Sequence, residues 1–141
     1  MFKRILVALK FTSASRQALE KGVGLARDYG SDLHIFHALD IGSMHLGRMM
    51  TQDEIESNIR ESLRRIRGRY IPEMKDIPEY DFEVWEGIPY VEIVKYAREK
   101  HADLIIMAHH TQKSSQEDTR LGSNIEQVIV RAGCPVISIN R

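Results

Sequence analysis

A polar stretch from Met107 to Asn124, MAHHTQKSSQEDTRLGSN, could bind an anion. It follows an apolar run typical of a buried strand and ends in Gly122-Ser123, where a helical pattern begins. The first turn of a helix presents free backbone N–H groups and the positive end of the helix dipole, which favour a phosphate. Gly122 permits a close approach of the backbone, and the Ser123 hydroxyl could bind the anion. Plain capping of the helix by Ser123 is the alternative.

A second turn that could bind an anion follows the first apolar run of the chain. Residues 9–13, LKFTS, place Lys10 directly after the predicted strand and Thr12-Ser13 at the start of a helix. The Lys10 ammonium could attract a phosphate to this turn. It could equally pair with an acidic residue of the first loop, Glu117 or Asp118, and close the cleft between the two loops.

The histidines do not form a metal-binding pattern. His109 and His110 are adjacent, so their side chains should diverge, and no cysteine or acidic partner stands at ligand spacing. His34 and His37 are an odd number of residues apart in a predicted strand, so they should lie on opposite faces of the sheet. We expect both to be core or interface histidines that bond to the backbone, and we expect no metal site.

Short apolar runs alternate with amphipathic segments along the whole chain. The runs predict strands at residues 5–9, 33–39, 82–85, 104–108 and 136–139, of which the third is the least apolar and should lie nearer an edge. Thr51 and Glu54 form a capping box before one helical pattern, and Ser123 and Glu126 form a second. The alternation predicts a single-domain α/β fold over residues 1–141, a doubly wound parallel sheet with helices on both faces. Ligands of such sheets bind at the carboxyl ends of the strands, where the strand order reverses.

The bulk composition excludes several classes of protein. Lys+Arg and Asp+Glu are 20 each, so a nucleic-acid or membrane surface built on bulk charge is not expected, although a local patch stays possible. Cys134 is the single cysteine, which excludes an internal disulfide. The apolar run after Met1 is too short for a signal peptide or a membrane span, so we expect a cytoplasmic protein.

The sequence resembles the universal stress protein family along almost its whole length. The resemblance is carried by FKRILVAL, ASRQALEKGVGLAR, LHIFHALD, ADLIIMAHH and LGSNIEQVIVRAGCPVISI, in this order. It implies a five-stranded parallel sheet in the order 3-2-1-4-5, which places the first and fourth strands at the reversal. The family divides into members that bind ATP through a Gly-x-x-Gly, nine residues, Gly-Ser or Gly-Thr pattern and members that lack the first glycines.

This chain departs from the ATP-binding pattern at most of its positions. The first two glycines fall on Ala108 and Thr111, and ten residues rather than nine separate Thr111 from Gly122. Lys10 replaces the acidic residue that follows the first strand, whereas Ala38 is an acceptable contact at the end of the second. A branched threonine resists the positive φ that a glycine adopts next to a phosphate.

The resemblance and the two loops together predict where a nucleotide or anion would bind. No cofactor is firmly implied, but ATP or AMP is possible, with weak or no ATP binding expected. The candidate binding residues are Leu9, Lys10, Ala38, Met107, Ala108, His110, Thr111, Gly122, Ser123 and Asn124.

The last predicted strand indicates that the chain pairs with another chain. It lies at a sheet edge by the resemblance, and an exposed apolar edge strand invites pairing with another chain. We expect a homodimer through this strand, by the residues Pro135, Val136, Ile137, Ser138, Ile139 and Asn140.

Three functions remain open on the sequence. The first is a dimeric, non-catalytic binding or regulatory module of the stress response with unknown protein partners. The second is a nucleotide switch that uses the loop after the fourth strand. The third is a slow ATP hydrolase, which we do not expect because the sequence has no Walker lysine motif, no supported Ser/His/Asp order and no paired carboxylates in the candidate loops. We therefore expect no catalytic residues.

Overall fold

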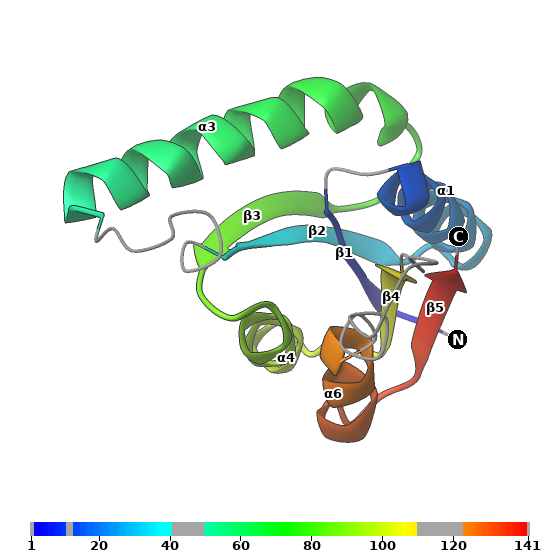
Figure 1. The fold of residues 1–141 in the computed structure, drawn as a ribbon. Coiled ribbons are helices and arrows are strands. Elements are labelled where there is room, and N and C mark those ends of the chain that lie inside the picture. Colours follow the sequence, from blue (N-terminus) through cyan, green and yellow to red (C-terminus); the bar gives the residue numbers. More distant parts are fainter. Residues whose placement is uncertain (1, 11–12, 41–49, 110–122, 141) are drawn as a thin grey trace.

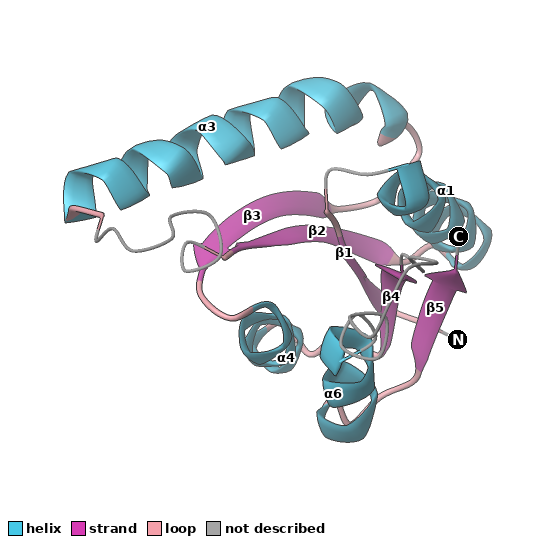
Figure 2. Cartoon of the chain, viewed as in Figure 1, coloured by secondary structure: helices cyan, strands magenta, loops and turns pink. Residues whose placement is uncertain are grey.

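The computed structural model of the chain describes residues 2–10, 13–40, 50–109 and 123–140. Strands and helices alternate along these residues, as the sequence predicts (Figures 1 and 2). The elements are β1 (Arg4–Ala8), α1 (Ser13–Tyr29), β2 (Asp32–Leu39), α3 (Gln52–Tyr70), the short 3-10 helix η1 (Ile71–Glu73), β3 (Tyr80–Glu86), α4 (Pro89–Glu99), β4 (Leu104–His109), α6 (Ser123–Arg131) and β5 (Val136–Asn140).

The strands form one five-stranded sheet in the order β3-β2-β1-β4-β5. All four strand pairs are parallel, with Val7 opposite Ile35 on one side and opposite Ile106 on the other. The predicted fold class and strand order are therefore confirmed. The order reverses between β1 and β4, so the carboxyl ends of these two strands flank the expected binding crevice.

Helices cover both faces of the sheet, and each face has its own hydrophobic core. Figure 1 shows α1 and α3 on one face and α4 and α6 on the other. The first core contains Leu19, Val23 and Ala26 of α1 against Val7 and Ile106 of the sheet. The second contains Tyr96, Ile93 and Val128 against Leu6 and Phe36. Since the central strands are buried on both faces, their sequences are apolar throughout rather than alternating.

Local signals in the sequence set most of the element boundaries. The Thr51 Oγ1 atom accepts a hydrogen bond from the Glu54 N–H (3.1 Å), and Glu54 Oε1 accepts one from the Thr51 N–H (3.2 Å), which confirms the capping box of α3. Gly30 ends α1 with a positive φ of 65°, a conformation that glycine adopts at little cost. Gly22 serves close packing instead, because a Cβ atom there would lie 2.4 Å from Val7 Cγ2.

Burial of the side chains changes along α3, and the position of β3 in the sheet confirms a prediction. The buried residues of α3 are Ser62, Ile66 and Tyr70, whereas Ile55 and Ile59 are only half-buried. The amino-terminal half of α3 extends past the strands, so it has less sheet to cover (Figure 1). The weakly apolar strand β3 lies at an edge of the sheet, as expected.

Candidate functional site at the carboxyl ends of β1 and β4

The structure brings several predicted site residues together at the reversal of the strand order. Leu9 and Lys10 follow β1, Ala38 lies near the end of β2, and Met107 and Ala108 lie near the end of β4. These five residues line one pocket of about 30 Å³, which we call the switch-point pocket. The remaining residues that line it are Ala8, Pro89 and Ile93.

The other predicted binding residues belong to the loop before α6. His110, Thr111 and Gly122 lie outside the described residues. Ser123 and Asn124 form the first turn of α6, and their side chains lie outside the described atoms, as does the predicted capping box at Ser123. The contribution of this loop to an anion site therefore stays a prediction.

Sequence reasoning missed the contribution of α4 to the switch-point pocket. Pro89 is the first residue of α4, where a missing N–H costs nothing, and this role was predictable. The approach of Pro89 and Ile93 to the carboxyl ends of β1 and β4 depends on how α4 packs on the sheet. Ile93 is buried, and with Pro89 it leaves a space far smaller than the ~300 Å³ at which ligand pockets begin.

The backbone donors that follow β1 are occupied within the chain. The Leu9 N–H donates to the Phe36 carbonyl oxygen over 2.8 Å. The Lys10 N–H donates to Ser15 Oγ over 2.7 Å, and Ser15 is fully buried. A ligand in the pocket would therefore have to take its hydrogen bonds from other groups, or displace these bonds at a cost of about 1 kcal/mol each.

His37 closes the same turn from β2. Its Nδ1 atom lies 2.7 Å from the Leu9 carbonyl oxygen, which confirms the expected bond to the backbone. Burial lowers the pKa of His37 below its usual value of 6.5, and the positive charges of Lys10 and Arg65 lower it further, although the bond to Leu9 acts in the opposite direction. The imidazole is therefore neutral at pH 7, and Nδ1–H is the donor.

His34, at the other end of β2, does not bond to the backbone as the sequence predicted. Its Nδ1 atom lies 2.9 Å from Asp81 Oδ1 of β3 and not against a backbone carbonyl. The Tyr96 hydroxyl donates to the same oxygen over 2.9 Å, and Lys100 Nζ lies 3.7 Å from Asp81 Oδ2. The sequence suggested a backbone partner because it gave no sign that Asp81 of the neighbouring strand stands opposite His34 in register.

The cluster of His34, Asp81, Tyr96 and Lys100 holds a carboxylate in its charged form. Burial by itself raises the pKa of Asp81, but the bonds from His34 and Tyr96 and the charge of Lys100 outweigh it and bring the pKa below the usual 3.8. Burial and the Asp81 charge raise the pKa of the Tyr96 hydroxyl, which stays a donor at every physiological pH. The cluster lies near the amino ends of β2 and β3, away from the switch point.

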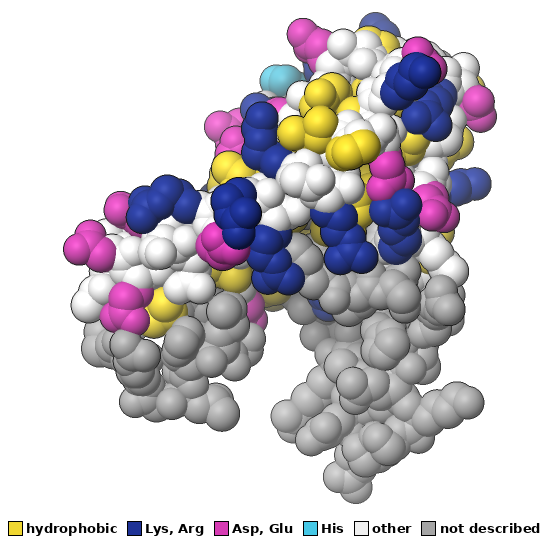
Figure 3. Space-filling model, turned by 90° about the horizontal axis from the view of Figure 1, so that it is seen from above, with side chains coloured by type: hydrophobic (Ala, Val, Ile, Leu, Met, Phe, Trp, Pro, Cys, Tyr) yellow, Lys and Arg dark blue, Asp and Glu magenta, His cyan; other side chains and the backbone are white. Residues whose placement is uncertain are grey.

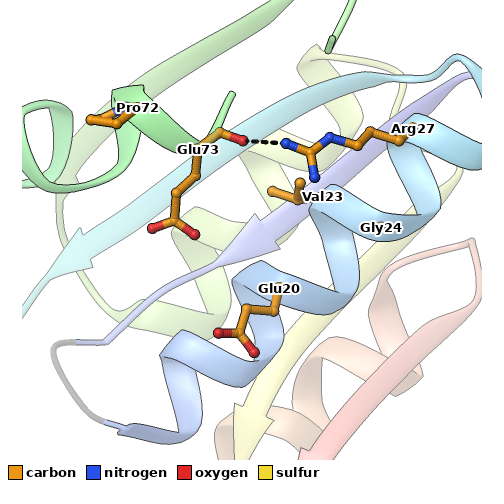
Figure 4. A pocket seen from close by; sticks show the side chains of 6 residues that line it. All are labelled: Glu20, Val23, Gly24, Arg27, Pro72 and Glu73. Carbon is orange, nitrogen blue, oxygen red and sulfur yellow. Dashed lines mark hydrogen bonds between the residues drawn. The ribbon is translucent and has the colours of Figure 1, made fainter. Parts of the chain in front are cut away.

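A larger hollow lies between α1 and η1 and has a structural role (Figure 4). Its volume is about 420 Å³, and its lining residues are Glu20, Val23, Gly24, Arg27, Pro72 and Glu73. Arg27 donates from Nη2 to the Glu73 carbonyl and from Nε to the Lys75 carbonyl, each over 3.0 Å. Arg16 pairs with Glu73 and, over 3.3 Å, with Glu20. The polar groups around the hollow are thus used to tie α1 to the segment that follows α3.

The surface over α3 carries charges of both signs. Figure 3 shows Lys and Arg side chains interspersed with Asp and Glu on this face. Arg64 and Glu61 form one exposed pair, with Nη2 2.7 Å from Oε1. The described part of this face is therefore not a uniformly cationic surface of the kind that binds nucleic acid.

The described residues hold no cluster of three or more potential metal ligands. Cys134 is half-buried, and burial together with the charge of Asp103 raises the pKa of its thiol. A raised pKa disfavours the reactive thiolate, which agrees with a structural role for this residue.

The comparisons with known proteins agree on one family. The model of the Universal stress protein family matches residues 1–140. Universal stress protein MJ0531 of Methanocaldococcus jannaschii is 27% identical over 150 residues, which cover 100% of this chain and 84% of the relative. The match therefore extends over the switch point and over both edges of the sheet.

Solved structures show the same fold. The structure of the hypothetical protein MJ0577 superposes with a TM-score of 0.78 and is 24% identical, covering 100% of this chain and 97% of the other. The universal stress protein of Archaeoglobus fulgidus, solved in complex with dAMP, has a TM-score of 0.61 and is 25% identical, covering 97% of each chain. Among the described residues, no helix is both long and apolar enough to cross a membrane.

Proposed function

This chain belongs to the universal stress protein family, and we propose that it acts in the cytoplasm as a homodimeric, non-catalytic regulatory module with weak or no ATP binding. Members of the family are generally regulators rather than enzymes, and they are commonly homodimers. The proposal for this chain goes further, because it assigns the switch-point pocket little affinity for a nucleotide.

The size and the donors of the switch-point pocket support weak binding most directly. Among the described residues, about 30 Å³ is enclosed between the ends of β1 and β4, far below the ~300 Å³ at which ligand pockets begin. The N–H groups of Leu9 and Lys10 already have partners within the chain. In addition, Lys10 stands where the ATP-binding pattern has an acidic residue, so a carboxylate acceptor for the nucleoside is missing at that position.

A nucleotide switch is the second candidate function. Five predicted residues from three separate strand ends meet at one pocket, as a site at the switch point requires. The universal stress protein of Archaeoglobus fulgidus was solved with dAMP, so a relative with this fold binds an adenine nucleotide. For this chain to do so, Ile93 or the turn at Leu9 would have to move.

Thermal melting with and without millimolar AMP, ATP and Mg²⁺ tests the two candidates. A nucleotide that binds the native state at a hundredfold excess over its Kd stabilises it by about 2.7 kcal/mol, so tight binding gives a clear rise in Tm. The proposal expects no rise. A rise that Gly122→Val abolishes would support the nucleotide switch and contradict the proposal.

A restored variant makes the negative result informative. Lys10→Asp, Ala108→Gly and Thr111→Gly together return three positions to the ATP-binding pattern of the family. If the missing acceptor and glycines limit binding, this variant should gain a rise in Tm with ATP. If the size of the pocket limits binding, it should not. If neither the native chain nor the variant responds, the three substituted residues are not the reason for weak binding, which leaves the size of the pocket and the longer spacing before Gly122.

The proposed homodimer pairs through β5. Among the described strands, β5 lies at an edge of the sheet and pairs with β4 alone, and Pro135 and Ser138 are exposed. Ile137 and Ile139 pack against the core that α1 covers, so they hold the edge strand in place. Sedimentation equilibrium at micromolar concentration should give a dimer, and Ser138→Lys, which puts a charge on the edge, should shift it toward a monomer. A native chain that sediments as a monomer would overturn this part of the proposal.

A further inference from the structure

The outer groove between α4 and α6 combines apolar side chains with an excess of positive charge. The two helices lie beside each other under the sheet (Figure 1). The groove has a volume of about 290 Å³ and is lined by Tyr90, Val91, Val94, Lys95, Arg98 and Arg131. Three of these six side chains are cations and none is a carboxylate, although the whole chain has as many acidic as basic residues.

Contacts within the chain orient the two exposed guanidinium groups. Arg98 of α4 donates from Nη2 to the Arg131 carbonyl oxygen at the end of α6, over 3.0 Å. The Arg131 guanidinium carbon lies 5.6 Å from the centre of the Tyr90 ring, and its Nη1 atom donates to the Gln127 side chain. A guanidinium that is already positioned loses little side-chain entropy when it binds an anion.

The positive charge of the groove is largely uncompensated. Within the described part of the chain, neither Arg98 nor Arg131 has a carboxylate at ion-pair distance. Lys95 has one, Glu92 Oε1, at 3.5 Å, but its side chain is 62% exposed, so this pair is weak. The guanidinium groups therefore keep most of their capacity to bind an acid group.

We propose that the groove between α4 and α6 binds a small organic anion that has a flat apolar body and one acid group. The volume of about 290 Å³ suits a ligand of one or two rings. The acid group would accept hydrogen bonds from Arg98 and Arg131, which match carboxylate geometry. The apolar body would lie on Tyr90, Val91 and Val94, where burial of apolar area contributes to binding. This site is separate from the switch-point pocket and does not depend on the proposed function.

Titration calorimetry with 2-naphthoate and its neutral analogue 2-naphthamide tests the proposal on the full-length chain. The two probes share the ring system and differ in charge. Since hydrogen bonds to charged groups contribute more than neutral ones, 2-naphthoate should bind about tenfold more tightly. Inorganic sulfate alone should bind weakly, because it lacks the apolar body. Equal binding of both naphthalene probes, undetectable binding of naphthoate at 5 mM (roughly the weakest affinity that such an assay resolves), or sulfate binding as tight as naphthoate would each overturn the proposal.

Variants place the binding in the groove. Arg98→Met with Arg131→Met removes both guanidinium groups and keeps apolar side chains of similar length, so naphthoate affinity should fall about tenfold. Arg60→Met, an exposed arginine on α3, is the matched control and should leave the affinity unchanged. Val91→Glu puts a competing carboxylate on the half-exposed wall of the groove and should also weaken naphthoate. If the double variant folds poorly, Val91→Glu still tests the site. Unchanged affinity in a folded Val91→Glu or folded double variant would contradict the assignment.

Discussion

The two ends of strand β2 show how differently one residue type can be used. His37, at the carboxyl end, bonds to the Leu9 carbonyl and stands close to the charges of Lys10 and Arg65. His34, at the amino end, bonds to the Asp81 carboxylate beside Lys100 and Tyr96. The carboxyl end thus uses a neutral imidazole to close a backbone turn, and the amino end uses hydrogen bonds to a carboxylate, with Lys100 beside it, to join β2, β3 and α4.

The difference indicates which end of β2 contributes more to the stability of the fold. At the amino end, Tyr96 is fully buried, stacks on Phe36 with ring centres 4.5 Å apart, and donates to Asp81. At the carboxyl end, the groups that could contact a ligand are Lys10 and the residues of a small pocket. We therefore expect substitutions at the amino end to change mainly stability, and substitutions at the carboxyl end to change mainly pH response and ligand binding.

The largest expected effect is that of Asp81→Ala. It removes the acceptor of the Tyr96 hydroxyl and of the His34 imidazole, so the free energy of unfolding should fall by about 2 kcal/mol. Urea denaturation at pH 7 measures this. Asp81→Asn keeps a carbonyl acceptor and should lose less. Equal losses for both variants would mean that the negative charge, and not the hydrogen bonds, stabilises the amino end.

Tyr96→Phe should have the next largest effect. The ring keeps its contacts with Phe36 and Trp85, and only the hydroxyl bond to Asp81 is lost. Asp81 is partly exposed and keeps its contacts with His34 and Lys100. The free energy of unfolding should therefore fall by about 1 kcal/mol. Denaturation of the double variant with Asp81→Ala sharpens the test, because the two losses should not add if the hydroxyl and the carboxylate act on each other.

The carboxyl end should respond to acid before the amino end does. The pKa of His37 is lower in the folded chain than its usual 6.5, so the unfolded chain takes up this proton first. The contribution of neutral His37 to the free energy of unfolding is therefore complete above pH 6.5 and is lost as the pH falls below that value. The pKa of Asp81 is lowered from 3.8, so its contribution persists to about pH 4 and is lost below that.

Denaturation curves from pH 7.5 to about 2 (roughly the span over which a histidine and a carboxylate of lowered pKa titrate) separate the two ends. His37→Gln should flatten the decline that begins near pH 6.5 and leave the decline below pH 4 in place. Asp81→Asn should do the reverse. If His37→Gln left the upper part of the curve unchanged, another group would be responsible for it, and the neutral role of His37 would be wrong.

The smallest expected effect is that of Lys100→Met. Its ammonium lies 3.7 Å from Asp81 Oδ2, and both side chains are more than a third exposed. Because solvent screens such a pair, the free energy of unfolding should fall by less than about 0.5 kcal/mol, and the fall should be smaller in high salt. A loss as large as that of Tyr96→Phe would show that Lys100 acts through its position 5.6 Å from the centre of the Tyr96 ring as well as through its charge.

The sequence by itself determined the fold and the location of the crevice. Continuous apolar runs such as ILVAL and LIIMA require strands that are buried on both faces, and the alternation with helices requires parallel crossovers. Capping signals such as Thr51 with Glu54, and the stop at Gly30, are local, so they could be read directly. The strand ends that line the switch-point pocket followed from the same pattern together with the family resemblance, which supplied the strand order.

Only the tertiary structure decided how much space that pocket has and which partners the histidines take. Ile93 and Pro89 narrow the pocket because of the way α4 packs on the sheet. The residue pattern of α4 does not say how closely the helix approaches the strand ends. His34 meets Asp81 because β2 and β3 pair in one register, although 47 residues separate the two in the chain. Likewise, Arg98 and Arg131 share a groove because α4 and α6 are neighbours under the sheet. Periodicity reports which face of an element is buried, whereas contacts between elements depend on register and packing, which the spacing of residues does not encode.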